Sequence, residues 1–285
     1  MKSAQLGGIS KGMKDLLVAR YCDLLMALSL PIIFRDYFSA ESSGGLPFVY
    51  NMWRNCRRVP GASGWIEHLS MVTELLKVPR ATEGCVVECG CYKGRSTVNL
   101  SLVCGRVGRK LLVFDSFCGL PQPSATDAMH HLVDARETHS YTQGAWAGSL
   151  DEVKANVGRF GDISVCEFHP GYFERTLPSF SRPVILAFID ADLRSSVETC
   201  LKHLWPLLQP GCCLFVHEAK HQEIASLFFD NCWWRKTLNC DAPGLIGAGC
   251  GLGLDPVPGG FKSSIGYTVK VPEARGSTLV PQLGT

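Results

Sequence analysis

The fold of this chain is decided by Val86-Val87-Glu88-Cys89-Gly90-Cys91-Tyr92-Lys93-Gly94. An apolar run followed by a turn with two glycines predicts a buried β-strand that leads into a helix. The glycines let the backbone approach a ligand, and the helix N-terminus supplies free N–H groups. Because the pattern is E-x-G-x-x-x-G and not G-x-G-x-x-G, it suits a ligand with an ammonium group better than a pyrophosphate. An ordinary tight turn between strand and helix explains the same residues equally well.

Residues 84–217 alternate short apolar runs with longer mixed segments, as parallel strands buried on both faces and their connecting helices do. The predicted strands are Cys85–Glu88, Leu111–Asp115, Ile163–Phe168, Val184–Asp190 and Cys212–His217, followed by a late pair at Trp233–Leu238 and Ile265–Val271. The predicted helices are Arg95–Val107, Ser149–Phe160, which opens on a capping box, and Ser195–Leu208, which stops at Pro210-Gly211. This alternation predicts an α/β fold with a mostly parallel seven-stranded sheet and helices on both faces.

The chain divides into three regions. Residues 1–80 are predicted to form a helical N-terminal extension that serves as a cap or in oligomerisation, residues 81–275 the main domain, and residues 276–285 a tail. Pro121–Gly148 and Asp241–Lys262 are long for loops of a compact α/β protein, so we expect lids or binding loops there.

Composition excludes several classes of protein. Hydrophobic residues make up 46% of the chain, charged residues 19%, and the net charge is +2, which gives no basic face for a nucleic acid. The apolar stretch Leu24–Phe34 is too short to span a bilayer and contains Pro31, and no signal peptide is recognisable. Fourteen cysteines without a paired C-x-x-C framework favour a reducing compartment. We therefore expect a cytoplasmic globular protein with no nucleic-acid or membrane partner.

An acid also ends the second predicted strand, in Phe114-Asp115-Ser116. In nucleotide-binding α/β folds, an acid at this place binds the hydroxyl groups of a ribose. Asp115 lies one helix after Glu88-x-Gly90, and the two motifs together favour a ligand that contains adenosine.

Acidic and imidazole side chains follow two further strands. Asp190 comes directly after the fourth run, and His217 and Glu218 follow the fifth. Because these strand ends are expected to be close in space, the three side chains can converge on one divalent cation or supply a general base for a hydroxyl. An acid that ends a buried run is costly to leave unpaired, which favours a functional role for Asp190. We interpret Asp192 and Ser195 as caps of the next helix.

Several stretches within residues 84–220 resemble the macrocin O-methyltransferase family of class I S-adenosylmethionine-dependent methyltransferases. In order they are Val87–Gly94, Phe114-Asp-Ser-Phe-Cys-Gly-Leu-Pro121, Gly148-Ser-Leu-Asp-Glu-Val153, Gly171-Tyr-Phe-Glu-Arg-Thr-Leu-Pro178, Asp190-Ala-Asp-Leu-Arg-Ser-Ser196 and Leu204-Trp-Pro-Leu-Leu-Gln-Pro-Gly211. The second and fourth strings together carry most of the specificity.

The resemblance implies a Rossmann-like methyltransferase fold, a homo-oligomer such as a homodimer, and S-adenosylmethionine as cofactor. It places Glu88 and Gly90 along the methionine part, Asp115 and Ser116 near the ribose, and Ser149 near the adenine. The full set of implied cofactor-binding residues is Glu88, Gly90, Tyr92, Asp115, Ser116, Ser149 and Asp190. The implied reaction is methylation of a sugar-type hydroxyl of a small-molecule natural product, with magnesium beside the acceptor oxygen. Asp190, His217 and Glu218 fall on the family's metal ligands, and Asp190 and His217 are the candidate catalytic residues.

The sequence departs from the family pattern in the second half of this site. His217-Glu218 replaces an Asp-Asp pair, and Arg194 replaces a tyrosine. Histidine is a poor magnesium ligand, because hard cations prefer oxygen. The site therefore holds a softer cation, or it is metal-free with His217 as the base, or the acceptor is a carboxylate that needs neither. Arg194 would pair with such a carboxylate, whereas the plainer reading makes it a surface residue.

The lid segment Pro121–Gly148 is expected to close over the acceptor. The aromatic and imidazole candidates in it are His130, His131, His139, Tyr141 and Trp146, and Gly244–Gly253 is expected to form another wall. Two other functions stay open: a nicotinamide-dependent oxidoreductase, against which the missing G-x-G-x-x-G counts, and a cofactor-binding protein that no longer methylates.

Overall fold

The computed structural model describes residues 35–40, 45–132, 136, 138–248 and 264–272. The predictions for Leu24–Phe34, for the tail and for most of Asp241–Lys262 lie outside these residues. The division of the chain at residues 80 and 275 stays a prediction.

A six-stranded sheet forms the centre of the described part of the chain. Its strands are β1 (Cys85–Cys89), β2 (Leu111–Asp115), β5 (Cys166–Pro170), β6 (Val184–Ile189), β7 (Leu208–Val216) and β8 (Gly266–Val269). Their order in the sheet is β5-β2-β1-β6-β7-β8. The first five are parallel, and β8 is antiparallel to β7. Strands β1 and β6 are buried along their whole length, as their continuous apolar sequences predict.

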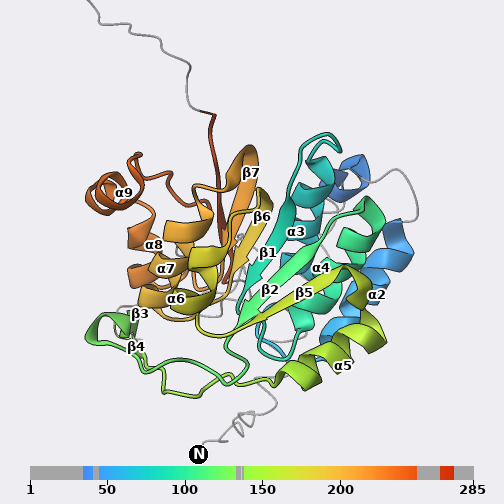
Figure 1. The fold of residues 1–285 in the computed structure, drawn as a ribbon, viewed down its shortest axis with the longest axis horizontal. Helices are drawn as coiled ribbons and strands as arrows, with labels where there is room; N and C mark the ends of the chain where they lie inside the picture. Colours follow the sequence, from blue (N-terminus) through green and yellow to red (C-terminus); the bar gives the residue numbers. More distant parts are fainter. Residues whose placement is uncertain (1–34, 41–44, 133–135, 137, 249–263, 273–285) are drawn as a thin grey trace, which may run out of the picture.

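Helices cover both faces of the sheet (Figure 1). One face carries α2 (Gly45–Arg58), α3 (Trp65–Lys77), α4 (Arg95–Val107) and α5 (Leu150–Phe160). The other carries α6 (Phe173–Thr176), α7 (Arg194–Leu204) and α8 (Gln222–Leu227), with α9 (Asn231–Leu238) beyond them. Two short strands, β3 (Met129–His130) and β4 (Thr138–His139), form a separate antiparallel pair beside α8. The predicted two-sided α/β sheet is confirmed.

Several predicted boundaries are confirmed as well. Strand β2 and helix α4 have the predicted bounds, and the side chain of Ser149 caps α5 by accepting a hydrogen bond from the Glu152 N–H. The carboxylate of Glu152 does not return to the cap, however, but pairs with Lys93 at 3.0 Å.

The prediction of a strand at Trp233–Leu238 is wrong, because these residues belong to α9. Asp230 caps this helix by accepting the Trp233 N–H at 3.0 Å, and Asn239 ends it in the left-handed conformation. The fully buried Trp234 packs against Trp205 and Phe228. Sheet pairing therefore involves six strands within the described residues, where seven were predicted.

Two other boundaries differ from the prediction. Helix α7 ends at Leu204 and not at Leu208, and Pro210-Gly211 lies inside β7, where the register with β6 shifts. Pro206 is the residue that prevents the helix from continuing. The predicted strand Ile163–Phe168 begins instead as a 3-10 turn, because Asp162 accepts the Ser164 N–H at 3.0 Å, and the strand starts at Cys166.

A buried polar network joins α2 and α3 to α4. The side chain of Asn99 donates to Nδ1 of His68 at 2.8 Å and accepts from Asn55 at 3.1 Å. Nε2 of His68 lies 2.8 Å from the Ser63 hydroxyl, so both ring nitrogens are occupied by neutral partners. Burial, aided by the positive charge of Arg95, lowers the pKa of His68 to about 3. The N-terminal helices are thus held on the sheet through a histidine that is neutral in the native state.

This network predicts a loss of stability in acid. The unfolded chain takes up a proton at His68 near pH 6.5, whereas the native chain does not until about pH 3, so stability falls as the pH falls between these values. Between pH 6.5 and 4.5 we expect the wild type to lose roughly 2–3 kcal/mol of unfolding free energy relative to His68→Gln, which keeps one donor and one acceptor but does not titrate. Urea unfolding at the two pH values measures this difference, and equal losses in both proteins would contradict it.

Candidate active site

Backbone hydrogen bonds fix the residues that follow the central strands in one row. The Gly90 N–H donates to the Phe114 carbonyl at 2.9 Å, the Asp190 N–H to the Cys89 carbonyl at 2.8 Å, and the His217 N–H to the Ile189 carbonyl at 2.8 Å. These bonds extend β1, β6 and β7 by one residue each, and Asp115 is the last residue of the neighbouring strand β2. Asp115, Gly90, Asp190 and His217 are therefore brought side by side at the carboxyl edge of the sheet.

In this row, Gly90 lies tightly against the backbone of Asp190. It has a positive φ of 87°, and a Cβ atom built on it would lie 1.9 Å from the Asp190 carbonyl oxygen. A side chain cannot be accommodated there, so the glycine is required for β1 and β6 to meet at this distance.

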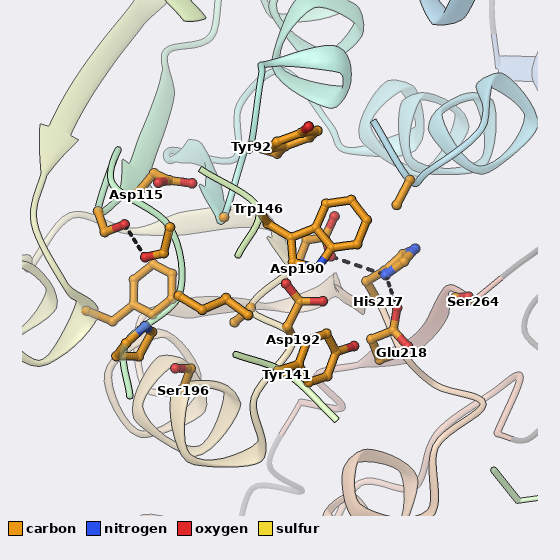
Figure 2. A pocket seen from close by; sticks show the side chains of 18 of the residues that line it. Tyr92, Asp115, Tyr141, Trp146, Asp190, Asp192, Ser196, His217, Glu218 and Ser264 are labelled. Atoms are coloured by element: carbon orange, nitrogen blue, oxygen red, sulfur yellow. Dashed lines mark hydrogen bonds and ion pairs between the residues drawn. The ribbon is translucent and has the colours of Figure 1, made fainter. Parts of the chain in front are cut away.

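A cavity of about 330 Å³ opens above this row. Figure 2 shows Tyr92 and Asp115 on one side of it, His217, Glu218 and Ser264 on the other, and Trp146, Asp190, Asp192 and Tyr141 between them. Of the six non-glycine residues with positive φ in the described chain, four line the cavity: Tyr92, Trp146, Asp192 and Glu218. Backbone conformations of this kind are costly and gather at functional sites.

The half of the cavity around Asp115 contains most of the predicted cofactor-binding residues. Oδ2 of Asp115 accepts the Cys91 N–H and Oδ1 accepts the Phe117 N–H, both at 2.7 Å, which fixes the carboxylate at the end of β2. Tyr92, Gly90 and Ser116 line the same half. Burial raises the pKa of Asp115, while the backbone N–H groups act against this.

Two predicted cofactor residues lie outside the cavity wall. Glu88 is fully buried, and burial outweighs the neighbouring Ser96 and Thr97 hydroxyls and raises its pKa to about 8. Ser149 is exposed and caps α5. Their assignment to the cofactor stays a prediction. The glycine floor and the fixed Asp115 carboxylate fit an adenosine-containing ligand that carries an ammonium group.

The other half of the cavity contains a chain of ionisable side chains. Nδ1 of His217 lies 3.2 Å from Oδ1 of Asp190 and 2.8 Å from Oε1 of Glu218, and the second Glu218 oxygen lies 2.7 Å from Nδ1 of His221. Burial would lower the pKa of His217, but the two carboxylates outweigh it and hold the pKa well above its usual range. Burial would raise the pKa of Glu218, but His217 and His221 hold the pKa well below its usual range. The cluster is therefore an ion-paired group.

Asp192 is a cavity residue and not a helix cap. Its φ of 57° carries the carboxyl group into the cavity beside Tyr141, and the N-cap of α7 is Leu193. Burial, and then repulsion by Asp190 and Glu218, raise the pKa of Asp192 to about 8. Ser195 is not a cap either, because its N–H and hydroxyl both donate to Asp127 of the lid.

The arrangement of Asp190, His217 and Glu218 does not fit a divalent cation. No group of three His, Cys, Asp or Glu side chains in the described part of the chain is placed to hold a metal ion. The imidazole and carboxylate atoms that would bind the cation face one another, and both oxygens of Glu218 are engaged by imidazoles.

The lid segment is anchored next to this cluster. Nδ1 of His130 pairs with Glu223 of α8 at 2.6 Å, and the Leu132 N–H donates to the Lys220 carbonyl at 2.9 Å. The predicted candidates Tyr141, His139 and Trp146 line the cavity, whereas His130 and His131 do not. The lid therefore covers the site through aromatic and imidazole side chains.

Sequence reasoning missed one wall of the cavity. Glu67 of α3 lies in the wall and is buried, and it accepts the Ser264 N–H at 2.9 Å from the segment before β8. Glu67 also accepts the Gly64 N–H at the start of α3, but no local sequence pattern reveals its long-range partner. Gly244–Gly253 was predicted as a wall, yet its described part, up to residue 248, does not line the cavity.

Arg194 is a helix-surface residue. Its Nε pairs with Glu198 at 2.9 Å, one turn further along α7, and the side chain is not in the cavity wall. This removes the reason to expect a carboxylate acceptor.

Comparison with known proteins assigns the family. The family described as Macrocin-O-methyltransferase (TylF) matches residues 65–240, which is more than half of the chain. The chain belongs to this family. It is therefore a methyltransferase that uses S-adenosylmethionine. No curated protein matches the sequence.

Two solved structures share the fold. The O-methyltransferase NovP is 19% identical, with a TM-score of 0.55 over 90% of this chain and 100% of that one. The calicheamicin methyltransferase CalS11 is 16% identical, with a TM-score of 0.54 over 94% of this chain and 99% of that one. No helix in the described residues is long and apolar enough to cross a membrane.

The Asp115 geometry predicts the effect of one amide substitution. Asp115→Asn leaves a single acceptor oxygen for two backbone N–H groups, so we expect affinity for S-adenosylhomocysteine to fall roughly tenfold or more. Isothermal titration calorimetry measures this, with the exposed Asp151→Asn as the matched control. An unchanged affinity in Asp115→Asn would argue against this placement of the cofactor.

Proposed function

We propose that this methyltransferase transfers a methyl group to a hydroxyl of a sugar-type ring in a small-molecule natural product. The family supports an oxygen acceptor. The observation that carries the proposal is the Asp190–His217–Glu218 group, which faces the same cavity as the cofactor residues. A hydroxyl is a weak nucleophile, and it needs a proton acceptor near the methyl donor.

We assign the cofactor to the half of the cavity floored by Gly90. Asp115 and Ser116 would hold the ribose, and Tyr92 packs edge-to-face against Trp146 of the lid, with ring centroids 5.4 Å apart, over the same region. The bound cofactor supplies an electrophilic methyl group on a sulfonium. The chain's task is to align an acceptor oxygen with that methyl and to exclude water.

Asp190 is the proposed proton acceptor for the acceptor hydroxyl. It lies between Gly90 and His217 in the row at the sheet edge, and its side chain keeps 21% exposure in the cavity. His217 is nearly fully buried and its Nδ1 lies 3.2 Å from Oδ1 of Asp190, so it would orient Asp190 beside the acceptor oxygen. Asp190 would accept the proton of the hydroxyl as the hydroxyl oxygen takes the methyl group that the bound cofactor supplies.

Methyl transfer to a panel of glycosides and to matched carboxylic acids, followed with labelled S-adenosylmethionine, tests the proposal. We expect label on a glycoside hydroxyl, and label on acids alone, or on no acceptor, would contradict it.

Two amide substitutions in the same loop separate the roles of its acids. Asp190→Asn removes the proton acceptor, and we expect turnover to fall roughly 10²–10⁴-fold. Asp192→Asn replaces a carboxyl group that burial keeps largely protonated, so turnover should fall less than about tenfold. Steady-state rates on one acceptor measure both, and equal losses would argue against Asp190 as the base.

We further propose that the protein is a cytoplasmic homo-oligomer, in the simplest case a homodimer. All cysteines in the described residues are free thiols, which suits a reducing compartment. Helix α2 exposes an apolar stripe of Leu46, Tyr50 and Trp53, with exposures of 64%, 56% and 37%. Stripes of this kind are typical of protein–protein contacts.

The stripe predicts the outcome of a charge substitution. Leu46→Glu combined with Tyr50→Glu should convert the oligomer to a monomer, because buried carboxylates without partners oppose association. Light scattering after size exclusion measures the mass, with Ile163→Glu, exposed elsewhere, as the control. A monomeric wild type would contradict the proposal.

A further inference from the structure

The side chains at the ends of β6 and β7 satisfy one another. His217 occupies the position between Asp190 and Glu218, with its Nδ1 at 3.2 Å from one carboxylate and 2.8 Å from the other. His217 and Glu218 are 5% and 7% exposed, so neither relies on solvent for its partner. The arrangement is that of an imidazole nitrogen enclosed by two carboxylates.

The lid holds this arrangement in place. His221 binds the second oxygen of Glu218 at 2.7 Å, and the ring of His139 stacks on His221 with an interplanar angle of 14°. His131 packs edge-on against His221 and forms a β-bridge with it. Glu218 is thereby kept turned toward His217, with neither oxygen left open for another cation.

We propose that the His217 ring takes the place of the divalent cation at this position, so that methyl transfer by this chain needs no metal. This inference rests on the proposed function of the same site. A cation there has two tasks: it balances buried carboxylates, and it draws the acceptor oxygen toward the methyl donor. The imidazole performs the first through its contacts with Asp190 and Glu218. The imidazole would also help to position the acceptor oxygen, because it fixes Asp190 and places its own N–H group near the acceptor.

Binding of Mn²⁺, followed by electron paramagnetic resonance, tests the inference without any acceptor. We expect the wild-type chain to bind no Mn²⁺ at millimolar concentration and to keep its full methyl-transfer rate after EDTA treatment. Stoichiometric Mn²⁺ binding by the wild type, or a rate that EDTA abolishes and Mg²⁺ or Mn²⁺ restores, would overturn it.

His217→Asp supplies the complementary test. It exchanges the ring for an oxygen ligand and opens the space between Asp190 and Glu218, so we expect one Mn²⁺ per chain to bind and the remaining activity to become metal-dependent. The double variant with Asp190→Asn should lose that binding, which identifies the site, and His139→Asp is the control for an added acid near the cavity. Metal binding equal to that of the wild type in a folded His217→Asp, shown by intact S-adenosylhomocysteine affinity, would overturn the inference. Should the variant fail to fold, the wild-type measurements decide alone.

These readouts distinguish the two proposals. Metal-dependent methylation of a hydroxyl by the wild type would contradict the inference of a metal-free site and would support the proposed function. If no acceptor is methylated, the proposed function is contradicted. The Mn²⁺ measurements would still show whether the site binds a metal.

Discussion

The structure depends on the row of backbone hydrogen bonds that joins β2, β1, β6 and β7 one residue beyond their regular pairing. Gly90 makes this row possible, since any side chain there would collide with the carbonyl of Asp190. Four segments that are far apart in the sequence are therefore aligned within hydrogen-bond distance, and each delivers its next residue to the same edge. The proposed cofactor half and the proposed acceptor half of the cavity share this floor, which would suit in-line transfer.

Charge balance is the second constraint on the site. Asp190, Asp192 and Glu218 lie close together with little solvent, an arrangement that costs free energy unless the charges are compensated. The chain compensates in two ways: His217 and His221 pair with Glu218, and Asp192 is driven toward its neutral form. The lid contacts the same group, because Tyr141 hydrogen-bonds Asp192 and the ring of His139 stacks on His221.

Sequence patterns predicted the parts of the fold that depend on local chemistry. Continuous apolar runs located the buried strands, and the N-cap at Ser149 placed α5, because both signals act within a few residues. The strand predicted at Trp233–Leu238 was wrong, because an apolar segment with two tryptophans is typical of a strand. The helix signals, Asp230 before it and Asn239 after it, are single residues that an apolar run outweighs.

The residues of the site were likewise predictable only where a signal within a few residues marks them. Asp115, Asp190 and His217 were found because each directly follows a strand, and the strand ends must meet. Asp192 was taken for a helix cap because only the left-handed turn at that residue directs it into the cavity. Glu67 and the anchoring of the lid to α8 depend on contacts across nearly 200 and about 90 residues of chain, which no local pattern contains.

The central claim is that Asp190, held without a metal by a His217 ring that also pairs with Glu218, meets the acceptor beside the cofactor. A crystal structure with S-adenosylhomocysteine and Mn²⁺, with anomalous scattering recorded at the manganese edge, tests it most directly. The account predicts the homocysteine sulfur above Gly90, the His217 ring between the two carboxylates, and no anomalous peak there. A manganese peak coordinated by Asp190 and Glu218, with the His217 ring turned away, would contradict it.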